Sequence, residues 1–115
     1  MRAIRLQLDT RGRVLLTPTL RAATGLMPGV KLQVSVEDGE LAISPGDNAE
    51  RGRQPTLDGK GRLTLPGQLR KSLNLVPGTV LLLRVDQPGL RLVTPGRLLG
   101  RMKAARLALT EALQD

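Results

Sequence analysis

The sequence predicts a mainly β protein that consists of two tandem ββαββ repeats followed by one C-terminal α-helix. The first reason is internal: two segments of the 115-residue chain line up at a shift of 49 residues. The second is that each segment alternates apolar and polar residues around short turns, as half-buried strands do. The third is composition, because 40% of the residues are hydrophobic and none is aromatic. A core of Leu, Val, Ala, Met and Ile needs many small contacts, which favours one compact β-barrel closed by both repeats.

The repeat is clearest at the first turn of each copy. Residues 8–16 read Leu-Asp-Thr-Arg-Gly-Arg-Val-Leu-Leu, and residues 57–65 read Leu-Asp-Gly-Lys-Gly-Arg-Leu-Thr-Leu. Further matches follow in the same order, and an insertion near Pro88 then shifts the register to 50. So many ordered matches argue against chance. We therefore divide the chain into a first repeat (1–46), a linker (47–55), a second repeat (56–96) and a C-terminal segment (97–115).

The first repeat illustrates the local signals of each unit. Alternating apolar residues flank the turn Asp9–Gly12, where Asp accepts backbone hydrogen bonds and Gly tolerates a positive φ. A short helix follows, with Thr17 as its N-cap and Pro18 at its first position. Gly25 is expected to end that helix in the left-handed conformation. Asn74 replaces it in the second repeat, and Asn also tolerates that conformation, so we expect the same helix end in both copies.

Two further strands complete each unit. Residues 31–36 alternate cleanly, a turn at 37–40 reverses the chain, and residues 41–43 return. The equivalent segment 80–85 is more continuously apolar, so we expect that strand to be buried on both faces. A unit of about 40 residues is too small to bury a stable core alone. We therefore expect the two units to close together, joined by a polar, Gly-rich surface linker.

The C-terminal segment has the pattern of an amphipathic helix. One apolar stripe falls at helical spacing, made by Leu98, Met102, Ala105, Leu109 and Leu113. Its basic residues come early and its acidic residues late, which opposes the helix dipole and suggests that the basic start has another use. Three interpretations stay open: a surface helix packed on the barrel, a helix for homo-oligomerisation, and an additional DNA contact.

The charge indicates a polyanionic partner. The formal net charge is +8, and such an excess is typical of proteins that bind nucleic acid or an acidic membrane surface. It is spread over the chain, with +2 in residues 1–46, none in 47–55, +4 in 56–96 and +2 in 97–115. The excess is therefore a property of the folded units, and no disordered basic tail accounts for it.

Composition argues against an enzyme. The chain has no Cys and no His, so it has no disulfide, no zinc site of the Cys/His type, no thiolate nucleophile and no imidazole base. The glycines form no phosphate-binding loop pattern, and no His is present to activate Ser or Thr. Glu37, Asp38 and Glu40 cluster, but at a predicted hairpin turn, where solvated side chains are expected. We expect no catalytic activity, no metal and no cofactor.

The chain also lacks membrane and export signals. No stretch approaches the roughly 18–20 apolar residues of a membrane span. The start, Met1-Arg2-Ala3-Ile4-Arg5, lacks the apolar run of a signal peptide. We expect a cytoplasmic, nucleoid-associated protein with no membrane partner.

The set of motifs resembles the AbrB/MazE/SpoVT family of DNA-binding proteins. Each copy carries Asp-x-x-Gly-Arg, then Leu-Arg, then Leu-x-Pro-Gly, and the resemblance covers residues 4–46 and 54–96. Two tandem copies resemble the MraZ-type regulators of that family. The resemblance implies a swapped-hairpin β-barrel that binds DNA through basic residues of the first turn and the short helix. By position these are Arg11, Arg13, Arg21, Lys60, Arg62, Arg70 and Lys71. One departure is Ala22, which stands where the second copy has Lys71.

The sequence thus favours a non-enzymatic transcriptional regulator that contacts double-stranded DNA through basic turns, because Arg side chains match phosphate oxygens and guanine edges. Arg13 and Arg62 could instead simply pair with Asp9 and Asp58 across the turns, and the two roles are compatible. The alternative function is an antitoxin-like or oligomerising module whose C-terminal helix binds a protein partner. A third alternative is a designed or reconstructed chain without an evolved function.

Overall fold

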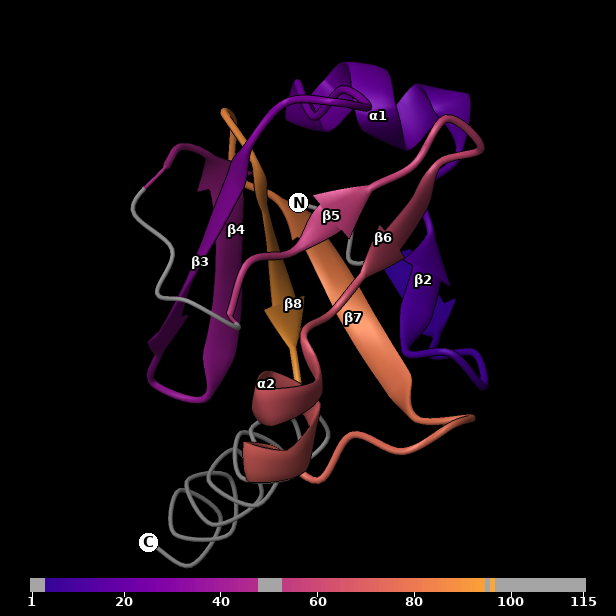
Figure 1. Cartoon of the computed structure of the whole chain (residues 1–115), viewed down its shortest axis with the longest axis vertical. Coiled ribbons are helices and arrows are strands. Elements are labelled where there is room, and N and C mark those ends of the chain that lie inside the picture. The colour runs from indigo at the N-terminus through magenta and orange to yellow at the C-terminus, as the bar shows by residue number, and fades with distance from the viewer. Residues whose placement is uncertain (1–3, 48–52, 95, 97–115) are drawn as a thin grey trace, which may run out of the picture.

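The computed structural model describes residues 4–47, 53–94 and 96, and the element order ββαββ occurs in it twice (Figure 1). The first five elements are β1 (Ile4–Gln7), β2 (Arg13–Leu15), α1 (Pro18–Thr24), β3 (Leu32–Glu37) and β4 (Glu40–Pro45). The second five are β5 (Thr56–Leu57), β6 (Arg62–Thr64), α2 (Gly67–Ser72), β7 (Val80–Val85) and β8 (Leu90–Val93). The strands form two antiparallel sheets, which confirms the predicted mainly β class. The helix predicted in 97–115 lies outside the described residues.

The strands pair mainly between the two halves of the chain. The five-stranded sheet has the order β1-β7-β8-β4-β3, and the three-stranded sheet has the order β2-β6-β5. The β2–β6 ladder pairs Arg13 with Thr64, Val14 with Leu63, and Leu15 with Arg62. Replacing each residue by its equivalent in the other repeat gives the same set of pairs. The β4–β8 ladder has the same property. The two repeats are therefore related by a pseudo-two-fold axis through these two ladders.

The symmetry fails at the edge strands. Strand β1 pairs with β7 of the other half, over four residue pairs. The equivalent pairing would join β5 to β3, but β5 pairs with its neighbour β6 and β3 forms the edge of the large sheet. The two halves therefore share one central arrangement and differ at their margins.

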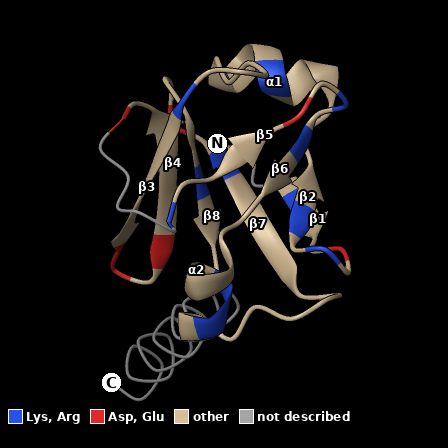
Figure 2. Ribbon diagram, viewed as in Figure 1, with Lys and Arg blue, Asp and Glu red and all other residues tan. Residues whose placement is uncertain are grey.

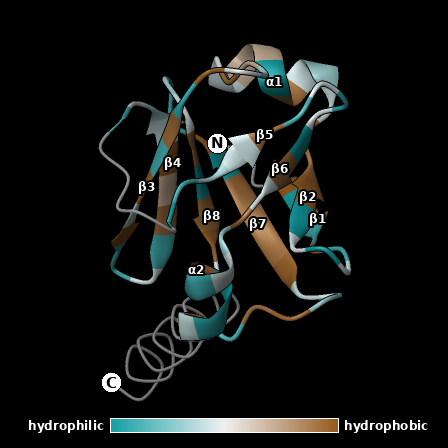
Figure 3. Cartoon of the chain, viewed as in Figure 1, coloured by the Kyte–Doolittle hydropathy of each residue, from teal (hydrophilic) through white to brown (hydrophobic). Residues whose placement is uncertain are grey.

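One cluster of buried side chains serves both halves. It takes leucines from the strands, from both helices and from the segments that flank them, and only Val14 and Ile43 are of another type. Figure 3 shows that hydrophobic residues predominate along β7, whereas α2 is mainly hydrophilic. A single shared core is what the small size of each unit requires, since about 40 residues cannot bury enough apolar surface alone.

The local signals at helix ends and turns are confirmed. The Thr17 hydroxyl accepts a hydrogen bond from the Leu20 amide at 3.3 Å, and Gly25 ends α1 with φ 73°. Asn74, the equivalent of Gly25, also has a positive φ of 54°, but α2 ends one residue earlier than expected, with Leu73 as its C-cap. The β3–β4 turn is tighter than expected, because Asp38 and Gly39 alone connect the strands, with φ 55° and 77°. An Asp-Gly pair with two positive φ values is typical of a two-residue hairpin turn.

The prediction that residues 80–85 are buried on both faces is wrong. Leu81 and Leu83 are fully buried, but Leu82 between them is only half-buried. Strand β7 belongs to an antiparallel sheet, and such sheets commonly pack one face on the core. The second face also carries Arg84, whose guanidinium reaches Glu40. The run of apolar letters therefore does not indicate two buried faces.

Candidate nucleic-acid interface

The first turns of the two repeats have the same internal hydrogen bonds. Asp9 Oδ1 accepts the backbone N–H groups of Arg11 and Arg13, both at 2.8 Å, and its Oδ2 accepts Arg13 Nε at 2.8 Å. Asp58 accepts the N–H groups of Lys60 and Arg62 at 2.9 Å and Arg62 Nε at 2.7 Å. Each aspartate thus closes the turn and also orients the arginine that follows it.

These hydrogen bonds explain the acidity of both aspartates. Partial burial raises the pKa of Asp9, but the hydrogen bonds from Arg13 and Arg11 outweigh it and hold the pKa below its ordinary value. At Asp58 the backbone N–H of Arg62 is the main cause that lowers the pKa. The pairing of the turn arginines with these aspartates, weighed from the sequence, is thus present. Ion pairs at a protein surface contribute little to stability, so the main effect of these pairs is to position the arginines.

The two turn arginines come together across the pseudo-two-fold axis. Val14 and Leu63 point into the core, with 1% and 0% exposure, so Arg13 and Arg62 lie on the opposite face of the β2–β6 ladder. Arg62 is paired with Leu15, two residues from Arg13. Such diagonal neighbours are about 7–8 Å apart, and one surface therefore presents an arginine from each repeat.

The helix arginines lie against the turns of the other repeat. Gly12 and Gly61 have φ values of +76° and +83°, which only glycine adopts without strain. A Cβ atom on Gly12 would overlap the guanidinium of Arg70, and one on Gly61 would lie 3.3 Å from Arg21 Cζ. The arginine of helix α2 therefore contacts the first turn, and the arginine of helix α1 contacts the second turn.

Backbone hydrogen bonds between the repeats fix the position of each turn glycine. The Leu16 amide donates to the Gly61 carbonyl at 2.7 Å, and the Leu65 amide donates to the Gly12 carbonyl at 2.9 Å. Both bonds run between the repeats, and they extend the β2–β6 ladder into the turns. The glycines are thus fixed on one side by the ladder and on the other by a helix arginine.

All seven predicted DNA-contacting residues belong to this one arrangement. We call them the basic band, and its members are Arg11, Arg13, Arg21, Lys60, Arg62, Arg70 and Lys71. Figure 2 shows basic positions on α1, β6, β2 and α2. The sequence identified the residues but did not reveal that each turn meets the helix of the other repeat.

A second group of cations has a different environment. Arg84 and Arg91 come from β7 and β8 and pair with acidic residues of the large sheet: Arg84 with Glu40, and Arg91 with Glu37, Glu40 and Asp86. The hydrogen bond to Asp86 is the main cause that raises the pKa of Arg91. These two arginines therefore form ion pairs within the large sheet and with the residue that follows β7, and they do not belong to the basic band.

The expectation of a solvated acidic turn is wrong for Glu40. Its side chain is 5% exposed and lies 3.2 Å from Arg84 and 3.6 Å from Arg91. The reason is that Arg84 and Arg91 are cross-strand neighbours in the β7–β8 ladder, and β8 also pairs with β4, which begins at Glu40. The sequence pattern contained no signal for this contact, because the partners are more than 40 residues apart.

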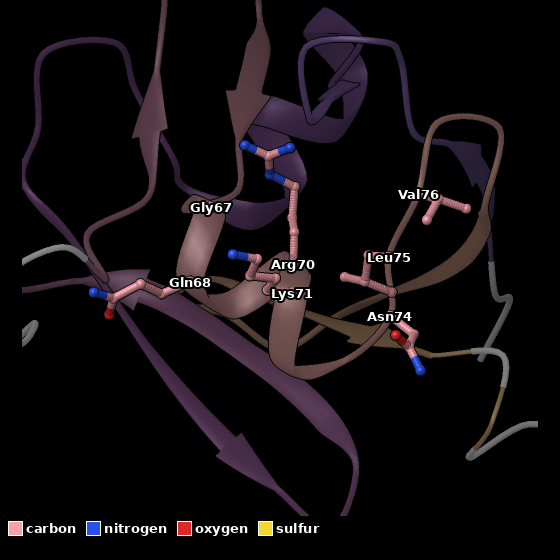
Figure 4. Close-up of a pocket in the computed structure, with 7 residues that line it drawn as sticks. All are labelled: Gly67, Gln68, Arg70, Lys71, Asn74, Leu75 and Val76. Atoms are coloured by element: carbon pink, nitrogen blue, oxygen red, sulfur yellow. The ribbon is translucent and has the colours of Figure 1, made fainter.

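A hollow lies beside each helix. At α2 it is lined by Gly67, Gln68, Arg70, Lys71, Asn74, Leu75 and Val76, and Figure 4 shows Arg70 extending well beyond the helix ribbon. The hollow at α1 is lined by Pro18, Arg21, Ala22, Gly25, Leu26, Met27 and Pro28. Most of these positions are equivalent in the repeat, but the lining at α2 has two cations, Arg70 and Lys71, whereas the lining at α1 has one, Arg21.

Other kinds of site find little support in the described part of the chain. Residues 4–47, 53–94 and 96 contain no group of three or more Asp or Glu side chains placed to hold a metal ion. Within the same ranges, no helix has the length and apolar character needed to cross a membrane. Comparison of the chain with protein-family models, with curated proteins and with solved structures found no match.

Proposed function

We propose that this protein binds double-stranded DNA through the basic band and acts as a non-enzymatic transcriptional regulator. The observation that carries the proposal is the joining of cations from both repeats on one surface: the turn arginines adjoin across the β2–β6 ladder, and a helix arginine lies over each turn. In this proposal the two sheets constitute the swapped-hairpin barrel that the family resemblance implies.

The chemistry of the band suits a duplex backbone. Arginine presents several N–H donors in a rigid fork that matches phosphate oxygens, and lysine adds a flexible point charge. Asp9 and Asp58 accept hydrogen bonds from the Nε–H groups of the arginines that follow them, which orients the guanidinium groups before any ligand binds. Pre-oriented donors lose less side-chain entropy on binding than free ones. Two such turns related by a pseudo-two-fold axis would contact both strands of one stretch of duplex.

A salt series with labelled duplex DNA tests the proposal. If all seven cations contact phosphates, the slope of log K against log salt concentration reaches about −6, since each contact contributes about −0.9. Fluorescence anisotropy should give a steep negative slope for the wild type, and Arg13→Ala/Arg62→Ala should bind much more weakly. Absence of binding near 50 mM salt, where phosphate contacts are strong, would refute the proposal.

A matched control separates the band from overall charge. Arg62→Ala and Lys31→Ala both lower the net charge by one, but Lys31 is 68% exposed and pairs with Asp47, outside the band. We expect Arg62→Ala to weaken DNA binding and Lys31→Ala to change it little. Circular dichroism checks that both variants remain folded. Equal losses would mean that charge alone, and no defined surface, attracts the DNA.

A further inference from the structure

The two ends of the basic band differ, and we infer that the DNA-binding surface is asymmetric. The end at α2 binds the duplex more tightly than the end at α1. The inference rests on the proposed DNA binding and adds the class of target: a duplex with one strongly held and one weakly held half-site. The α2 end consists of the first turn with Arg70 and Lys71, and the α1 end of the second turn with Arg21.

The first difference is charge. The α2 end carries Arg11, Arg13, Arg70 and Lys71 with the acid Asp9, a formal net charge of +3. The α1 end carries Arg21, Lys60 and Arg62 with the acid Asp58, a net charge of +2. The missing cation is at the position of Ala22, which is exposed like its equivalent Lys71. The α2 end therefore has one more side chain free to reach a phosphate.

The second difference is how the helix arginines are held. Arg70 Nε donates to the Leu65 carbonyl at 3.0 Å, which fixes the side chain over the first turn. Arg21 Nε is shielded from solvent, yet among the described residues it has no hydrogen-bond partner. The guanidinium of Arg70 is thus oriented by a hydrogen bond before DNA arrives, whereas Arg21 is held against the second turn by packing alone, with its Nε–H unsatisfied.

The third difference is the surface beside the helices. The hollow at α2 has Lys71 and Asn74 on its wall, and the equivalent positions at α1 are Ala22 and Gly25. Each hollow also has one exposed apolar side chain at an equivalent position, Met27 at α1 (63% exposed) and Val76 at α2 (60% exposed), so this position does not distinguish the two ends. A phosphate backbone that passes both helices therefore meets Lys71 and Asn74 at α2 but no polar side chain at the equivalent positions of α1.

Salt slopes of single variants test the inference on the full chain with a labelled duplex of fixed sequence. Lys71→Ala should make the slope less steep by about 0.9, and Ala22→Lys should make it steeper by a similar amount. One phosphate contact of this kind changes the affinity about 3.5-fold between 50 and 200 mM salt. Lys71 and Ala22 are both exposed, so neither substitution removes a buried contact.

Two controls distinguish position from charge. Ser35→Lys raises the net charge to +9, as Ala22→Lys does, but Ser35 is exposed on β3 at the far edge of the large sheet. It should change the slope little. Arg21→Ala and Arg70→Ala each remove one cation, and we expect Arg70→Ala to raise the Kd more. Thermal unfolding of both variants shows whether a loss of fold contributes.

The outcomes separate this inference from the proposed function. Suppose that the wild type binds DNA, but that Ser35→Lys changes the salt slope as much as Ala22→Lys, or that Arg21→Ala raises the Kd as much as Arg70→Ala. The asymmetry of the surface is then refuted, and the proposed DNA binding still stands. If Lys71→Ala leaves the slope unchanged, the inference is likewise overturned. If the wild type does not bind duplex DNA at all, the proposed function fails and the inference fails with it.

Discussion

Alanine at the turn glycines gives the sharpest test of the structure. Gly12 and Gly61 occupy the same repeat position with nearly the same φ, so the sequence predicts equal effects for their substitution. The surroundings differ. A Cβ atom on Gly12 would overlap the far end of the flexible Arg70 side chain, whereas a Cβ atom on Gly61 would overlap the backbone carbonyl oxygen of Leu16. We therefore expect Gly61→Ala to destabilise the protein more than Gly12→Ala.

The magnitudes follow from the contacts. A positive φ costs a non-glycine residue about 1–2 kcal/mol, which applies to both variants. In Gly12→Ala, displacing Arg70 also removes its hydrogen bond to the Leu65 carbonyl, worth about 0.5–1.5 kcal/mol, so the total is about 1.5–3.5 kcal/mol. In Gly61→Ala, the rigid Leu16 carbonyl must move and the Leu16–Gly61 ladder bond is strained, so we expect about 3 kcal/mol or more. Gly59 has open space around its Cα, and Gly59→Ala should stay within about 0.5 kcal/mol of the wild type.

Thermal unfolding measures the order of the three variants. A loss of 1 kcal/mol lowers the Tm of a small domain by about 4–8 °C, so Gly59→Ala should be well separated from the other two variants, and Gly61→Ala should have the lowest Tm. Gly12→Ala should also weaken DNA binding at a temperature where it is folded, because Arg70 is displaced from the band. If Gly61→Ala is no less stable than Gly12→Ala, or if Gly59→Ala is as unstable as either, the described contacts of the turns are wrong.

Three other measurements test the turns and the core. Asp58→Asn should strengthen DNA binding at low salt, because the loss of a negative charge from the band outweighs the loss of the contact that orients Arg62, whereas Asp47→Asn outside the band should have little effect on the anisotropy titration. The pKa values of Asp9 and Asp58 are lowered in the folded state, so the stability that they contribute is present above the unfolded pKa of about 4 and is lost as the pH falls through the folded values. The Tm of the wild type should accordingly fall more steeply below about pH 4 than that of Asp9→Asn/Asp58→Asn, and parallel curves would contradict the assignment. Leu63→Ala should cost about 2–5 kcal/mol in urea unfolding because Leu63 is fully buried in the β2–β6 ladder, and a cost below 1 kcal/mol would show that Leu63 is not part of the shared core.

Features that depend on neighbours along the chain could be predicted from the sequence. The Asp-x-x-Gly-Arg turns are such a case, since every hydrogen bond of Asp9 and Asp58 spans two to four residues. The Thr17 cap and the helix end at Gly25 are equally local. The internal repeat and the family resemblance also mark the positions of the seven residues of the basic band, and their contact with DNA stays a prediction. Local hydrogen bonding and repeat spacing depend only on residues close in sequence or at a fixed shift, so they can be predicted from the order of the residues.

What joins the two halves was decided only by the tertiary structure. The contact of Arg70 with Gly12, the pairing of β1 with β7, and the burial of Glu40 between arginines all unite residues far apart in the chain. Alternation of apolar residues shows which face of a strand is buried but not which strand lies beside it. The partner is chosen by how a single shared core closes around both repeats, and that choice places each helix arginine over the turn of the other repeat. The same closure produces the unequal ends of the band, because Arg70 finds the Leu65 carbonyl and Arg21 finds no equivalent acceptor among the described residues.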